Sequence, residues 1–110
     1  MMQVSDIKWS VSEKEVAQNA FESAYSREID ALMKEVCEKA SAIADLQDVW
    51  KLHDFLSARR HEIEGKYDYK YPILIFVFAQ LVKEGWLQLN ELEGLEASKL
   101  SKIAAIARMS

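Results

Sequence analysis

Residues 50–64, WKLHDFLSARRHEIE, gather the residue types of an active site within 15 positions: one Trp, two His, one Asp and one Ser. His53, Asp54 and Ser57 are the types that form a hydrolytic triad, in which a carboxylate orients a histidine and the histidine activates a serine. His61 and Glu64 are types that bind metal ions. The segment therefore raises two enzymatic interpretations, a hydrolase and a metalloprotein.

The geometry of a helix weakens the triad. The apolar spacing of the segment predicts a helix, in which successive side chains point about 100° apart. We therefore expect His53 and Asp54 to diverge, so that Asp54 cannot easily orient His53. Ser57 lies one turn beyond His53, but no glycine-rich elbow is present to supply an oxyanion hole.

A metal site is also poorly supported by the spacing. His53 and His61 are eight residues apart, about 12 Å along a helix axis, which is too far to share one ion. His61 and Glu64 form an i, i+3 pair like those of di-metal bundles, although such sites need further ligands from facing helices. A second copy of the chain would duplicate this pair. A metalloprotein or hydrolase using His53, His61 and Glu64 therefore stays open as the alternative function.

The same polar residues favour recognition over catalysis, because they follow one side of the helix as a ribbon. A Trp on a polar side is costly to leave in water, and Trp and Arg are enriched at interface hot spots. His53 and Arg60 lie at the edge of the ribbon, and Arg60 is spaced to pair with Glu64. We interpret the ribbon as an interaction patch, the alternative being a Trp50 buried between two subunits. Its members are Trp50, Asp54, Ser57, His61 and Glu64.

Apolar periodicity predicts the elements that carry this ribbon. A first helix follows Ser10 or Ser12, each of which could form a capping box with a Glu three residues later, and runs for about 30 residues. A second begins near Asp45, and we expect its core stripe to comprise Val49, Leu52, Leu56, Ile63 and Tyr67.

The rest of the chain predicts shorter elements. KYDYKYP reads as a polar, tyrosine-rich connection that ends at Pro72, a residue suited to a first helical turn. The apolar run after it predicts a buried third helix that ends at Gly85. Two short helices are expected over 89–95 and 97–109.

These elements define an all-α fold with two long antiparallel helices and three shorter ones. We expect residues 1–9 to be a loose arm, 10–68 a long-helix dimerisation part and 72–109 a short-helix part of one domain. The short helices cannot cover two much longer apolar stripes, so a homodimer should complete the bundle.

Composition excludes several classes of protein. The chain is half hydrophobic and carries a net charge of −4, which argues against disorder and against nonspecific binding of nucleic acid. One cysteine, Cys37, fits a reducing compartment, and the first ten residues lack the apolar core of a secretory signal. The longest apolar run is far below the roughly 18 residues of a membrane span. We therefore expect a cytoplasmic protein.

The middle of the sequence also resembles a known family. DVWKLHDFLSARRHEIEGKYDY and the following IFVFAQLVKEGW, with AYSREIDAL and SKIAAIAR, are similar to the fluorescence recovery proteins of cyanobacteria. The resemblance extends from about Trp9 to Met109. One departure is Arg59, where we expect Lys in relatives, and Tyr71–Pro72 lies in a connection that varies.

The resemblance implies an all-helical, dimeric regulator that is not an enzyme and needs no cofactor. The implied partner is the photoactivated orange carotenoid protein, bound mainly through its C-terminal domain. The implied effect is faster return to the orange form and detachment from the phycobilisome, in the cytoplasm or at the cytoplasmic face of the thylakoid membrane. Family residues tied to dimerisation, activity or partner contact match Trp50, His53, Asp54, Arg60, Phe76 and Lys102.

Overall fold

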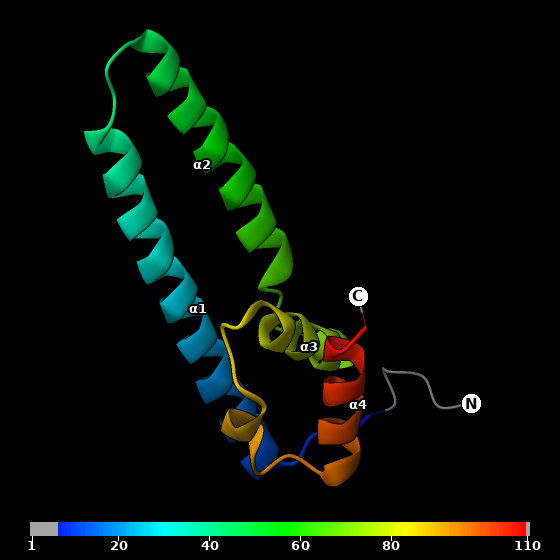
Figure 1. The fold of residues 1–110 in the computed structure, drawn as a ribbon. Coiled ribbons are helices and arrows are strands. Elements are labelled where there is room, and N and C mark those ends of the chain that lie inside the picture. Colours follow the sequence, from blue (N-terminus) through cyan, green and yellow to red (C-terminus); the bar gives the residue numbers. More distant parts are fainter. Residues whose placement is uncertain (1–6, 110) are drawn as a thin grey trace.

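Two long antiparallel helices form a hairpin that projects from a cluster of shorter helices (Figure 1). The computed structural model describes residues 7–109, and within that range there is no β-strand, only an isolated bridge between Glu93 and Leu95. The α-helices are α1 (Val11–Ser41), α2 (Leu46–Lys66), α3 (Leu74–Glu84) and α4 (Ala97–Ala107), and the 3₁₀ turns are η2 (Tyr71–Ile73) and η3 (Leu89–Leu92). The predicted all-α class is confirmed. The short helix expected over 89–95 is instead the single turn η3.

The molecule is elongated, with extents of 55 × 25 × 23 Å. We call residues 29–65 the stem, and residues 7–28 together with 66–109 the head. Helix α1 belongs to both, because its N-terminal half packs in the head and its C-terminal half forms one side of the stem. In the described part of the chain, no helix has the length and apolar character that a membrane crossing requires.

Local chemistry sets where the long helices begin. The Ser10 hydroxyl accepts the Glu13 backbone N–H at 3.1 Å, and the Glu13 carboxylate accepts the Ser10 N–H at 3.0 Å. This capping box selects Ser10 over Ser12 as the N-cap of α1. Asp45 caps α2 by accepting the Asp48 N–H at 3.1 Å. Gly85 ends α3 as predicted, with a φ of 87° that favours glycine.

The hydrophobic core lies in the head. Small residues of α1, Ala17, Ala20 and Ala24, are buried and let the other elements approach its backbone closely. Helix α3 is buried on most sides, as its sequence predicted, and it packs against α4. The largest fully buried apolar side chains are Leu74, Phe78, Leu81, Leu87, Leu92 and Ile103.

The connection between α2 and α3 is aromatic packing rather than the polar link that we expected. Tyr67 and Tyr69 are half-buried and both meet the Phe21 ring of α1 edge-on, at centroid distances of 5.5 and 4.9 Å. Tyr69 in turn contacts Tyr71 at 5.5 Å. The aromatic contacts of these tyrosines thus hold α1 against the start of α3.

The expected loose arm is wrong for residues 7–9, whereas residues 1–6 lie outside the described residues. Trp9 is only 9% exposed, and its ring lies 5.7 Å from that of Tyr71. The Lys99 ammonium lies 4.8 Å from the Trp9 ring centroid and donates to the carbonyl of Lys8 at 2.6 Å. Aromatic and cation–π contacts therefore hold this segment on the head.

Candidate protein-interaction surfaces

Helix α2 buries a face that is rotated from the one its sequence predicted. Of the expected core stripe, Ile63 is buried and Leu52 and Tyr67 are half-buried, but Val49 and Leu56 are 39% and 37% exposed. The face turned inward also includes Phe55, Arg59 and Lys66. In the stem α2 has one neighbouring helix, α1, which can cover only one side of it.

An apolar strip is left uncovered on α2. We call Leu46, Val49, Trp50 and Leu56 the stem strip; Trp50 is 52% exposed and Leu46 61% exposed. Exposed apolar surface of this kind is typical of an interaction site.

The three residues that could form a triad, His53, Asp54 and Ser57, are exposed to solvent on α2. The His53 ring nitrogen and the Asp54 carboxylate approach to 3.4 Å, so these side chains diverge less than expected, although the contact is at the limit of a hydrogen bond. Their side chains are 72% and 82% exposed. Ser57 is exposed on the same helix. No low-dielectric pocket surrounds these groups to strengthen such chemistry.

The metal interpretation finds no ligand cluster. Among residues 7–109, no three His, Cys, Asp or Glu side chains converge closely enough to hold an ion. Glu64 instead accepts the Arg60 guanidinium at 2.9 Å, which is the predicted i, i+4 pair, and this bond raises the pKa of Arg60. Arg60 and Glu64 therefore compose a solvated, charged surface beside the stem strip.

The head carries the two remaining candidate residues. Phe76 on α3 is 48% exposed, although α3 is otherwise largely buried, and Lys102 is exposed on α4. Phe76 borders an open groove of about 390 Å³ between α2 and α3, lined also by Glu62, Lys66, Val77, Gln80 and Glu84. Thus Trp50, His53, Asp54 and Arg60 share one helix of the stem, while Phe76 and Lys102 belong to helices of the head.

Two buried charged clusters were missed by sequence reasoning. Glu13 is 3% exposed and binds the Lys99 ammonium at 2.9 Å through both carboxylate oxygens. Burial raises the pKa of Glu13, but bonds from the Ser10 N–H, Lys99 and the Glu96 N–H outweigh it and hold the pKa at about 2. The spacing of the buried α1 positions 13, 17, 20, 24 and 28 is the signal that could have placed Glu13 and Glu28 inside.

The second cluster surrounds Glu28, which is 1% exposed. Its carboxylate accepts the Tyr67 hydroxyl at 2.8 Å, the Arg59 guanidinium at 3.2 Å and the Lys66 ammonium at 2.6 Å. Burial raises the pKa of Glu28, but these partners outweigh it, and the pKa lies below its ordinary value. The Tyr67 pKa is raised, by burial first and by Glu28 second.

Fold and surfaces together define an all-helical protein with an exposed apolar strip on α2 and buried charges that are paired within the chain. Comparisons with known proteins identify the class further. Residues 9–107 match the family model described as photoprotection regulator fluorescence recovery protein. The chain is 52% identical over 109 residues to the fluorescence recovery protein of Synechocystis sp. (strain ATCC 27184 / PCC 6803 / Kazusa), covering 99% of this chain and all of that protein.

Solved structures agree with this match. The fluorescence recovery protein of Fremyella diplosiphon superposes with a TM-score of 0.91 at 58% identity, and that of Synechocystis sp. PCC 6803 with 0.90 at 54% identity. Each comparison covers 93% of this chain and 100% of the other. The chain therefore belongs to the fluorescence recovery protein family, a family of photoprotection regulators rather than of enzymes.

Proposed function

We propose that this chain binds the photoactivated, red form of the orange carotenoid protein, mainly through that protein's C-terminal domain. Binding accelerates return to the inactive orange form and detachment from the phycobilisome, which ends non-photochemical quenching and restores antenna fluorescence. The observation that carries this proposal is the match over residues 9–107 to a family of photoprotection regulators. The proposed place of action is the cytoplasm, or the cytoplasmic face of the thylakoid membrane.

The mechanism that we propose is differential binding along the path of reversion. A protein can shift an equilibrium, or lower a barrier, only by binding one state more tightly than another. The red form has separated domains, so a binder that grips one domain and favours the closed arrangement speeds closure. No covalent step and no cofactor are required of this chain.

We further propose how the surfaces are divided. The stem strip pairs with a second copy of the chain, which covers Leu46, Val49, Trp50 and Leu56. Phe76 and Lys102 on the head then stay accessible to the carotenoid protein. His53, Asp54 and Arg60, beside the strip, supply charge that sets the register of binding.

The direct experiment follows the dark reversion of a photoconverted orange carotenoid protein with and without this chain. Faster decay of the red absorption, increasing with the amount of chain added, is the expected result. An unchanged rate in the presence of excess chain would remove the proposed function.

Loss of charge beside the stem strip should weaken the effect without unfolding the helix. Asp54 is exposed, and Arg60 is exposed and forms an ion pair with Glu64. We expect Asp54→Leu and Arg60→Leu each to reduce the acceleration of reversion by roughly tenfold, the loss typical of a hot-spot residue. Circular dichroism should be unchanged. Lys51→Leu, at an exposed position on the opposite side of α2 from Arg60, is the matched control for the Arg60 variant and should retain the full effect.

Truncation of Phe76 separates partner binding from folding. Because its ring is 48% exposed, Phe76→Ala should leave the melting temperature within about 2 °C while weakening the carotenoid protein's binding by roughly tenfold. Titration with the photoconverted protein measures the affinity. Met33→Ala, which truncates an exposed apolar side chain of the stem, should bind normally. Equal losses in the two variants would mean that Phe76 has no special role.

A further inference from the structure

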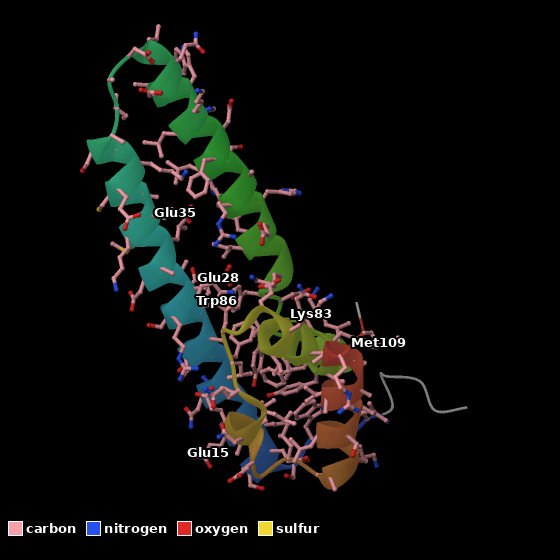
Figure 2. All side chains as sticks on the ribbon, in the orientation of Figure 1. Glu15, Glu28, Glu35, Lys83, Trp86 and Met109 are labelled. Carbon is pink, nitrogen blue, oxygen red and sulfur yellow. The ribbon has the colours of Figure 1, made fainter. Side chains whose placement is uncertain are left out.

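A buried carboxylate joins three elements where the stem meets the head. Glu28 projects from the middle of α1 (Figure 2) and accepts bonds from Arg59 and Lys66 of α2 and from Tyr67, the residue that follows α2. These partners are 31 to 39 residues away in sequence. The cluster is therefore a tertiary contact, and it acts on the last two turns of α2.

The same cluster continues to α3. The Lys66 ammonium, on a side chain that is 7% exposed, bonds both to Glu28 and to Glu84 at 2.6 Å. Gln80 also donates to Glu84. One lysine thus connects a carboxylate of α1 with a carboxylate of α3, and the end of α2 lies between them.

This arrangement matters because the two candidate surfaces are on different helices. Asp54, Arg60 and the stem strip move with α2, whereas Phe76 moves with α3. Only residues 67–70 connect α2 to the turn that precedes α3. Besides packing along α1, helix α2 is held relative to α3 by the contacts of its last turns, and there the Glu28 cluster supplies charge-assisted hydrogen bonds.

We propose that Glu28 is a positioning residue: its carboxylate, with Lys66 and Arg59, sets the orientation of the stem surface on α2 relative to the Phe76 surface on α3. Charge-assisted hydrogen bonds have defined geometry, whereas the hydrophobic effect is non-directional. The consequence for activity rests on the proposed function, but the orientation itself can be measured on the protein alone.

Distances between spin labels test the orientation. Labels are attached at Ala58→Cys on α2 and Ser98→Cys on α4, both exposed, in a Cys37→Ser background, and labelled protein is diluted with unlabelled protein. Wild type should give one narrow distance distribution. Glu28→Gln keeps the shape of the side chain but removes its charge, and should shift or broaden the distribution. A distribution unchanged in Glu28→Gln would overturn the proposal.

A second variant separates positioning from stability. Glu28→Gln leaves the buried Lys66 without one of its counter-charges, so it will also lower the melting temperature. Replacing a whole buried ion pair by apolar side chains is often neutral, so Glu28→Met combined with Lys66→Met should recover most of that stability. The distribution should stay broad in this double variant. A narrow distribution in the double variant would mean that the cluster keeps buried charges paired but does not set the orientation of α2.

The reversion assay supplies the functional outcome. Wild type accelerates reversion if the proposed function holds, and Glu28→Gln and the double variant should both be about tenfold less effective, since each loses the alignment of two contact surfaces. If wild type is active and the double variant equals it, the positioning role is wrong; if wild type is inactive, the proposed function is wrong. Arg27→Gln is the matched control. It breaks the neighbouring bond to Glu91, which does not involve α2, and should leave distances and reversion unchanged.

Discussion

Lys99→Met is expected to lower the melting temperature by about 15 °C, the largest loss of stability among the single changes considered. The substitution gives an unbranched apolar side chain one atom shorter than lysine and leaves the Glu13 carboxylate buried without its cation. Breaking a buried ion pair from one side costs about 3–5 kcal/mol, and each kcal/mol lowers the melting temperature of a domain this size by roughly 4–6 °C. The carbonyl of Lys8 and the Trp9 ring lose their partner as well.

Thermal unfolding followed by circular dichroism measures this effect. Lys102→Met is the matched control, since it removes an exposed lysine three residues later on the same helix and should change the melting temperature by less than about 3 °C. A similarly small change in Lys99→Met would mean that the Glu13–Lys99 pair contributes nothing to stability.

The pH dependence checks the same pair independently. The pKa of Glu13 is held at about 2 in the folded chain, below its ordinary value of 4.5. The resulting stabilisation is fully present above pH 4.5 and is lost as pH falls towards 2, by about 3 kcal/mol in total. In Lys99→Met the folded pKa should rise towards 4.5, so the acid-induced loss should be smaller than in wild type.

Sequence patterns predicted the parts of this fold that depend on local chemistry. A capping box at Ser10 or Ser12, the start of α2 near Asp45 and the end of α3 at Gly85 all follow from the conformations available to a few adjacent residues, and the structure selects Ser10. Helical periodicity likewise identified α1 and α2 as long helices. The divergence of His53 and Asp54 that helix geometry predicted was too large, because their side chains approach to 3.4 Å.

What periodicity could not predict depends on contacts across the chain. Glu13 and Glu28 resemble ordinary surface charges until Lys99 and Lys66 are brought beside them from 86 and 38 residues away. The inward face of α2 was misjudged for a related reason. Arg59 and Lys66 lie on the inward face of α2, where they bind Glu28. With that face turned inward, Val49 and Leu56 point towards solvent. The buried charges and the exposed apolar strip are thus two results of one arrangement.

The exposure of the stem strip leads to the second large expected effect, on the association of two copies of the chain. If a two-fold dimer covers the stem strip, each substitution there is made twice in one interface, because both subunits contribute the same residues. A buried Trp at the centre of an interface commonly contributes 2 kcal/mol or more, so Trp50→Ala should weaken dimerisation by about 30-fold or more. Leu56→Glu places two carboxylates in an apolar contact and should dissociate the dimer at micromolar concentration.

Light scattering over a dilution series distinguishes these outcomes, with wild type at twice the mass of Leu56→Glu. Ala58→Glu adds the same charge two residues away, on the other side of α2, and should remain dimeric. A wild-type chain that is monomeric at every concentration would remove the dimer from the proposal.

The monomeric variant Leu56→Glu then tests whether Trp50 contacts the carotenoid protein. If Phe76 and Lys102 alone contact the carotenoid protein, Leu56→Glu monomers should keep part of their effect on reversion. If Trp50 itself faces the partner, Trp50→Ala should abolish that remainder in the Leu56→Glu background.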